Sequence, residues 1–482
     1  MIRQLGKATA GSGAPGRLDI KPGRWKERAM AGQITTAREP NRLVAWVGSL
    51  EAAPFALATI VAAAASVASI FVLTRLLAAE GYGLYAAMLG LVMIVQNAGY
   101  LALQTSIIRF HSRAQDAEAR HRLATAVRLA FLAATLAVAI GWLVAVRWLG
   151  GAGMTAPLAL AGLVLLVLRG WLSLVQAWNR AMGRPWAFFW LEAVQAIGSL
   201  TLAVAALTIF PGEPAAAIWA AALGTCLAAA LSPGLLAQPF RLRGSGPLLR
   251  ELLGYGAPLA LVFFAGATLA VSDRLLVAVY AGASAAGAYA VAFSIADRVM
   301  TLLLLPVPLA AKPGLFAMWE RDGEAAARPI LMRSARWLII LGFPAATILA
   351  VAPEPLANLL AGGGLAEGAA LMIPWLAVGS LLSCLTTLHF SLSFQLARKT
   401  QWMLVAIGIP AALNVGANLV LIPRFGMSAA GWTTVGGYAA ALFLVALLGR
   451  PHLAIPFPLK TTLRTLLACG ALAMILRLLL GS

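Results

Sequence analysis

Three arginines stand inside apolar runs of the sequence, where a charge is expensive. Arg169 stands alone in its run, and the pairs Asp273-Arg274 and Asp297-Arg298 lie within VSDRLLVAVYAGASAAGAYAVAFSIADRVM. An isolated arginine at the centre of a bilayer costs about 2.5–3.5 kcal/mol on insertion scales, so it usually faces a cavity or a charged partner. The pattern predicts either structural ion pairs or a cationic cavity for an anionic ligand.

The depths of these residues follow from their places in the runs. Arg298 comes about 12 residues after the start of its run, or about 18 Å along a helix, which is near the middle of a bilayer. Arg169 is expected at a similar depth, and Arg274 and Arg75 are expected within about two turns of the outer surface. For ion pairing, Asp297 is a candidate partner of Arg274. Glu192 is a candidate partner of Arg169, and Arg75 is close enough to a helix end to snorkel.

The runs that carry these charges belong to a chain suited to a bilayer. Of the 482 residues, 61% are hydrophobic and 11% are charged, and the mean hydropathy is +0.88; soluble domains carry about 25% charged residues. Thirteen apolar runs of about 20 residues predict an all-α polytopic membrane protein. The runs are 46–76, 83–108, 124–148, 155–179, 186–210, 215–238, 255–280, 286–312, 333–352, 369–396, 402–421, 428–449 and 460–480.

The basic residues indicate how the chain is oriented. If the N-terminus is cytoplasmic, 29 of the 36 Lys and Arg residues fall on the cytoplasmic side, which agrees with the positive-inside rule. The net charge of +19 therefore reflects the orientation of the chain in the membrane, and we expect no nucleic-acid partner. Residues 1–42 are read as a flexible basic tail, without the apolar segment of a signal peptide, that could touch anionic membrane lipids.

An internal repeat divides the chain. TRLLAAEGYGLYAA starts at Thr74 and DRLLVAVYAGASAAGAYAV starts at Asp273, so Arg75 matches Arg274 and Gly83 matches Gly287. The offset of six runs gives both halves the same orientation. We therefore expect twelve core helices in two parallel six-helix lobes that transport by alternating access, plus an extra C-terminal helix. The expected boundaries are 43–240 and 250–450 for the lobes and 458–482 for the extra helix.

At this point the chain resembles the oligosaccharide flippases, the Wzx-like polysaccharide biosynthesis proteins of the multidrug/oligosaccharidyl-lipid/polysaccharide exporter superfamily. The resemblance rests on the repeated segments, on YGAPLALVFFAGATLAVSDRLLVAVY (255–280) and on NVGANLVLIPRFGMSAAGWTT (414–434). It implies a central cationic cavity in a bacterial inner-membrane protein. It also implies a polyprenyl-pyrophosphate-linked oligosaccharide as cargo, for O-antigen, capsule or exopolysaccharide, with a polymerase and other assembly proteins as possible partners.

Within that resemblance, residues are assigned to three roles. Guanidinium groups bind pyrophosphate through paired hydrogen bonds, and polar side chains on the helices, among them Gln195, bind sugar hydroxyls. Substrate binding is assigned to Arg298, Arg169, Arg274, Arg75, Asn414 and Asn418. Proton or ion coupling is assigned to Asp273 and Asp297, and hinges to Pro258, Pro306 and Pro308, because proline frees backbone carbonyls in membrane helices.

Other functions find less support in the sequence. It contains no phosphate-binding G-x-x-x-x-G-K-[ST] segment, its four histidines and three cysteines lack metal spacing, and its outer loops are short. We therefore expect no enzyme activity, cofactor or metal. Two alternatives stay open: a multidrug or cation antiporter of the same superfamily, which would need carboxylates in the membrane, and a non-transporting scaffold of a polysaccharide assembly complex.

Overall fold

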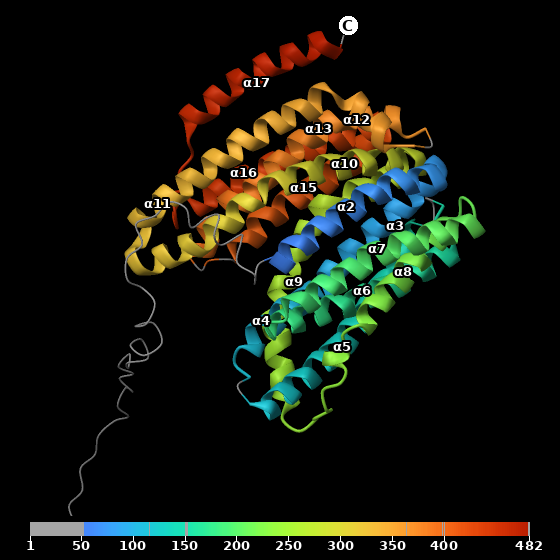
Figure 1. Ribbon diagram of the computed structural model, residues 1–482, viewed down its shortest axis with the longest axis vertical. Helices are drawn as coiled ribbons and strands as arrows, with labels where there is room; N and C mark the ends of the chain where they lie inside the picture. Colours follow the sequence, from blue (N-terminus) through green and yellow to red (C-terminus); the bar gives the residue numbers. More distant parts are fainter. Residues whose placement is uncertain are drawn as a thin grey trace, which may run out of the picture. The chain divides into compact units, whose positions relative to one another are not determined.

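The computed structural model describes residues 53–114, 116–149, 153–362, 364–397, 399 and 401–480. These residues form helices, turns and loops and contain no strand (Figure 1). The first helices are α2 (Ala53–Leu76), α3 (Ala78–Gly99), α4 (Leu101–His111), α5 (Ala117–Leu149), α6 (Ala156–Ala181), α7 (Pro185–Ile209) and α8 (Pro214–Ala230). They are followed by α9 (Ser245–Tyr280), α10 (Ala283–Leu304), α11 (Pro306–Val351), α12 (Pro353–Leu360), α13 (Ala366–Leu385), α14 (Leu392–Leu396), α15 (Trp402–Phe425), α16 (Met427–Gly449) and α17 (Leu459–Leu480). The predicted tail 1–42 lies outside the described residues.

The apolar runs predict the helices well. In the described part of the chain, twelve helical segments are long and apolar enough to cross a membrane, and α17 is the last of them. The 17-residue α8 is shorter but occupies the predicted sixth run. All thirteen runs thus coincide with helices, as expected where each backbone group must be satisfied inside its own helix. The protein is an integral membrane protein with the predicted all-α fold.

Helix contacts fall into two groups that follow the repeat. Most of helices α2–α8 pack mainly on one another, and most of helices α10–α16 do the same, while α17 packs on α11 (Figure 1). Helix α3 is the exception, because it also packs extensively on α9 and α10. The long α9 belongs to both groups. Its early residue Leu252 is buried with Phe110 and Leu123 of the first group, and its later part packs on α15. The helix begins at Ser245, before the predicted lobe boundary at 250.

The groups also meet where the repeat glycines lie. Helix α3 crosses α10 so closely that a Cβ atom added to Gly83 would lie 1.7 Å from the carbonyl oxygen of Ala283. A Cβ atom on Gly287 would lie 3.2 Å from the Cα atom of Gly83. Glycine is required at such a crossing because it lets two backbones approach. We call this region, with the nearby ends of α2 and α12, the glycine seam.

The proposed hinge prolines occupy two kinds of position. Pro258 lies inside α9. Helix α10 ends at Leu304, and Pro306 is the first residue of α11, with Pro308 in the same turn. The predicted run 286–312 lies within one helical segment, Ala283–Phe316, because Leu305 between α10 and α11 keeps helical dihedral angles. Proline fits the first turn of a helix, where no amide hydrogen is needed. A break within α11 occurs at Gly323, whose φ of 76° and ψ of −166° are not helical.

Candidate functional site: a cationic cavity between the helix groups

A cavity of about 370 Å³ lies between the two helix groups. Helices α2, α3, α6, α7 and α8 of the first group form most of its wall, and α9 and α10 close the remainder. Its polar and aromatic lining residues are Ser66, Ser69, Tyr82, Tyr85, Arg169, Glu192, Gln195, Ser199, Arg274, Ser294 and Arg298. The cavity thus brings together three of the predicted substrate-binding arginines, which come from α6, α9 and α10.

These three arginines are not held in ion pairs. Among the described residues, no carboxylate oxygen lies within 4.0 Å of the guanidinium nitrogens of Arg169, Arg274 or Arg298. The Nε atoms of Arg169 and Arg274 are buried and have no hydrogen-bond partner. The Arg274 guanidinium lies 4.3 Å from the centroid of the Phe293 ring, a cation–π contact that leaves its hydrogen-bond donors available. The side chain of Arg298 is exposed.

One carboxylate lines the same wall. Glu192 accepts a 2.6 Å hydrogen bond from Nε2 of Gln176 on α6. It forms no ion pair with Arg169 in the described structure, so the predicted pairing of these two residues is not found. With three guanidinium groups and one carboxylate in its described lining, the cavity is positive. Such a wall favours an anionic group over a cation.

Arg75, the fourth predicted arginine, lies outside the lining of this cavity. Its guanidinium donates to the carbonyl oxygens of Leu359 and Leu360 in α12, at 3.3 and 3.4 Å, and stacks on Phe71. The neighbouring Thr74 Oγ1 accepts a 3.0 Å hydrogen bond from the amide of Gly362. Carbonyls at a helix end lack partners within the helix, so an arginine can satisfy them. Arg75 therefore joins the two helix groups at the glycine seam.

Asn414 and Asn418 also lie away from the cavity, within the second helix group. Both side chains are buried, and Asn418 donates from Nδ2 to Oδ1 of Asp273 and, at 3.2 Å, to Oδ1 of Asn414. The other carboxylate oxygen of Asp273 accepts from the hydroxyls of Tyr289, at 2.9 Å, and Thr434. Neither asparagine lines the cavity: the Asn418 amide donates to a buried carboxylate, and Asn414 accepts from Asn418.

The other predicted coupling residue differs from Asp273. Asp297 is half-buried on α10, next to Arg298, and no ion pair with Arg274 is found in the described structure. Asp273 is 1% exposed and surrounded by hydroxyl and amide groups from α10, α15 and α16. Within each Asp-Arg pair, the two side chains therefore face different surroundings. Sequence neighbours lie about 100° apart around a helix.

Several lining residues had no predicted role. Tyr82 and Tyr85 of α3 line the cavity with ring centroids 6.0 Å apart, and Ser66 and Ser69 of α2 also line it. The serines lie three residues apart within the small-residue stretch AAAASVAS, and this spacing on one helical face was the available signal.

Comparisons with known proteins identify the family and the fold of the chain. Residues 72–365 match the model of a family described as polysaccharide biosynthesis protein. The fold is similar to that of the lipid II flippase MurJ in an inward closed conformation, with a TM-score of 0.72 and 12% identity over 87% of this chain and 91% of MurJ.

Two further solved structures have the same fold. One is an inward-facing multidrug resistance MATE family transporter of the MOP superfamily, with a TM-score of 0.64 and 15% identity over 84% of this chain and 94% of that one. The other is a MOP superfamily transporter from Pyrococcus furiosus, described as having a binding pocket of reverse polarity. It has a TM-score of 0.53 and 16% identity over 82% of this chain and 95% of that one. No curated protein sequence matches the chain.

Proposed function

Because the chain belongs to the family of polysaccharide biosynthesis proteins, we propose that it flips a polyprenyl-pyrophosphate-linked oligosaccharide across a membrane. The cargo would move from the cytoplasmic to the outer leaflet of a bacterial inner membrane, with the N-terminus of the protein in the cytoplasm. It would serve the assembly of O-antigen, capsule or exopolysaccharide. The basic cytoplasmic loops support this orientation.

The observation that carries the proposal is the set of unpaired guanidinium groups in one cavity. Arg169, Arg274 and Arg298 face a common space, and none forms an ion pair with a residue in the described part of the chain. A pyrophosphate group offers several oxygens to such donors, and bidentate contacts with arginine are strong. The headgroup would exchange water for guanidinium groups at mid-membrane, while the lipid tail stays in the bilayer. Tyr82, Tyr85 and Gln195 would then contact the sugar.

Alternating access needs a seam that closes on one side of the cavity. The glycine seam meets this requirement, because α3 and α10 touch at Gly83 and Gly287 and Arg75 ties α2 to α12. In the proposed orientation it closes the outer side. The cavity would next open outward by separation of the two helix groups, with Pro258, Pro306 and Pro308 as hinges.

The driving force would act through the second helix group. Asp273 is buried among hydroxyl and amide groups, a donor set that suits a proton or a small hard cation. Asp297, the sequence neighbour of the cavity residue Arg298, is a second candidate. We place Asn414 and Asn418 with this coupling group, because they contact each other and Asn418 contacts Asp273.

The test is a flipping assay in proteoliposomes with a fluorescent polyprenyl-pyrophosphate sugar. Arg169→Ala and Arg298→Ala should each slow flipping at least about tenfold, because a charge-assisted hydrogen bond contributes about 1.5–3 kcal/mol. Arg424→Ala is the matched control, since it removes an exposed arginine at the end of α15 that does not line the cavity. Wild-type rates in both cavity variants, at equal insertion, would disprove the assignment.

A multidrug or cation antiporter is the second candidate, because a MATE transporter has the same fold and Glu192 lines the cavity. A cationic dye in the same vesicles separates the two functions. The flippase proposal expects sugar-lipid movement without dye movement, and the reverse result would favour the antiporter. Movement of neither, with the protein correctly inserted, would favour a scaffold in an assembly complex.

A further inference from the structure

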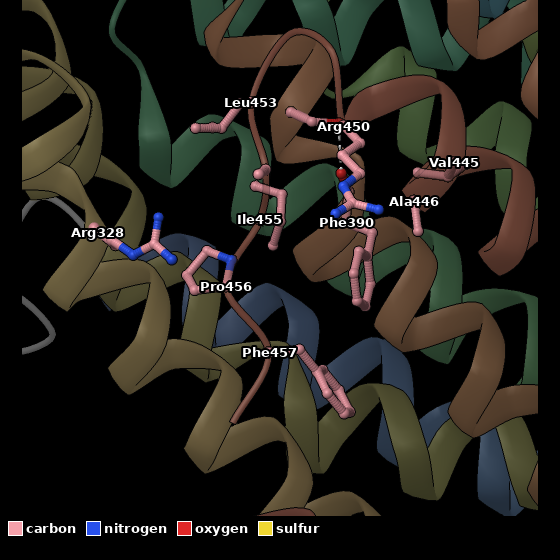
Figure 2. A pocket seen from close by; sticks show the side chains of 11 residues that line it. Arg328, Phe390, Val445, Ala446, Arg450, Leu453, Ile455, Pro456 and Phe457 are labelled. Carbon is pink, nitrogen blue, oxygen red and sulfur yellow. Dashed lines mark hydrogen bonds between the residues drawn. The ribbon is translucent and has the colours of Figure 1, made fainter. Parts of the chain in front are cut away.

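A second basic pocket lies outside the central cavity, where α16 ends. It has a volume of about 350 Å³ and is bounded by α11, by the turn of π-helix at Thr386–Phe390, by α14, by α16, and by the linker between α16 and α17 (Figure 2). Its two charged lining residues are Arg328 and Arg450. They come from distant parts of the sequence, so the pocket exists only in the folded chain.

The chemistry of the pocket has a charged part and an apolar part. No acidic residue is found in its described lining. Arg328 has one neighbouring carboxylate, that of Glu324, at 3.9 Å on an exposed surface, and pairs of this kind contribute little. The remaining wall holds Phe390 and Phe457, with ring centroids 6.1 Å apart, and aliphatic side chains including Ile455. Two cationic side chains beside an apolar wall suit an amphiphilic ligand with an anionic headgroup.

The depth of the pocket relative to the membrane agrees with this chemistry. Arg450 directly follows α16, which ends at Gly449, and α17 begins at Leu459. Both helices are long and apolar enough to cross a membrane, so their ends mark the boundary between hydrocarbon and headgroups. Basic pockets between membrane helices at this level bind phosphate-containing lipid heads.

The linker that forms one wall is held in place. The ring Nε2 of the buried His389 lies 3.2 Å from the carbonyl oxygen of Pro456, and Phe390 packs against Phe457. His389 and Phe390 belong to the π-helical turn, a form that is rare and frequent at functional sites. The pocket is therefore shaped by contacts within the protein and does not depend on a ligand to form.

We propose that this pocket binds the phosphate head of an anionic phospholipid from the adjacent leaflet, with Arg328 and Arg450 on the phosphate and the acyl chains along Phe457. The lipid would be a resident ligand, separate from the transported cargo. It would link α11, α16 and the linker to α17, which otherwise packs mainly on α11.

Lipid binding to the purified full chain tests the proposal. Native mass spectrometry would measure retention of phosphatidylglycerol against phosphatidylcholine. The wild type should prefer phosphatidylglycerol, and Arg328→Gln and Arg450→Gln should each weaken that lipid about fivefold, since a basic residue near anionic lipid contributes about 1 kcal/mol. The double variant should lose the preference. Arg333→Gln with Arg336→Gln is the matched control, because both are exposed on α11 and neither lines the pocket.

Three results would overturn the proposal. Unchanged retention in the single variants would show that the arginines do not hold the lipid. Equal losses in the control would assign the preference to general surface charge. Displacement of the lipid by millimolar glycerol phosphate would show a site for soluble anions, whereas retention of the lipid in its presence supports the proposal. The single variants keep the test valid if the double variant fails to fold.

Discussion

Replacing Gly83 by alanine tests whether the glycine seam is a gate. Gly83 lies in α3 at the crossing with α10. The change adds one methyl group, leaves all charges in place and does not touch the arginines of the cavity. In a helix, alanine is favoured over glycine by about 1 kcal/mol, so any loss must come from the crossing.

The size of the effect follows from the geometry. The new Cβ atom would lie 1.7 Å from the oxygen and 2.4 Å from the carbon of the Ala283 carbonyl, whereas ordinary contact begins at 3.4 Å. The shortfall of 1.7 Å falls on backbone atoms, so no side-chain rotation relieves it. Overpacking of this kind costs about 1–3 kcal/mol, occasionally more, which disfavours the closed seam by about 5- to 150-fold. At Gly287 the nearest contact is 3.1 Å, so Gly287→Ala should be milder.

Spin labels on opposite sides of the seam would measure the change. Glu80 in the first turn of α3 and Glu367 in the first turn of α13 are exposed and suit a labelled pair. In reconstituted protein, Gly83→Ala should shift the distance distribution to longer values and slow flipping about fivefold or more. Gly436→Ala is the control, because a Cβ atom there meets no atom within 4 Å.

The reasoning fails if Gly83→Ala keeps both the wild-type distances and the wild-type flipping rate. That result would mean that the added methyl group is accommodated without separating α3 from α10, and the seam would then not act as a gate. A loss of both properties in Gly436→Ala as well would point to general damage of the fold.

The remaining predictions concern the cavity, the coupling group and the turn before α10. Arg298→Lys should slow flipping less than Arg298→Ala in the same assay, because lysine keeps the charge but not the paired donors. Asp273→Asn should preserve sugar-lipid binding but remove the response of flipping to an imposed proton or sodium gradient, and a response equal to that of the wild type would exclude Asp273 as the coupling residue. Gly282→Ala should lower the free energy of unfolding by about 1–3 kcal/mol, because the backbone of Gly282, with φ of 93° and ψ of 164°, suits only glycine. An unchanged melting temperature would contradict this.

In the internal repeat, some of the matched residues have related positions in the structure and others do not. The repeat matched Gly83 with Gly287, and these two glycines meet in the structure where α3 crosses α10. The matched arginines have different surroundings: Arg75 donates to carbonyls of α12, and Arg274 faces the cavity. The sequence could not separate them, because equivalent helix positions acquire their neighbours from other helices. For the same reason the tyrosines and serines of the cavity lining were missed.

The membrane helices and the cations within them follow from the sequence alone, because hydrophobic length and the satisfaction of backbone hydrogen bonds are local properties of a segment. Tertiary structure decided which cations share a space. Arg169, Arg274 and Arg298 converge since α6, α9 and α10 turn those faces toward one cavity, while Asn418 turns toward Asp273. The direction of a side chain around a helix has meaning only relative to the helices packed against it, and that packing is not local.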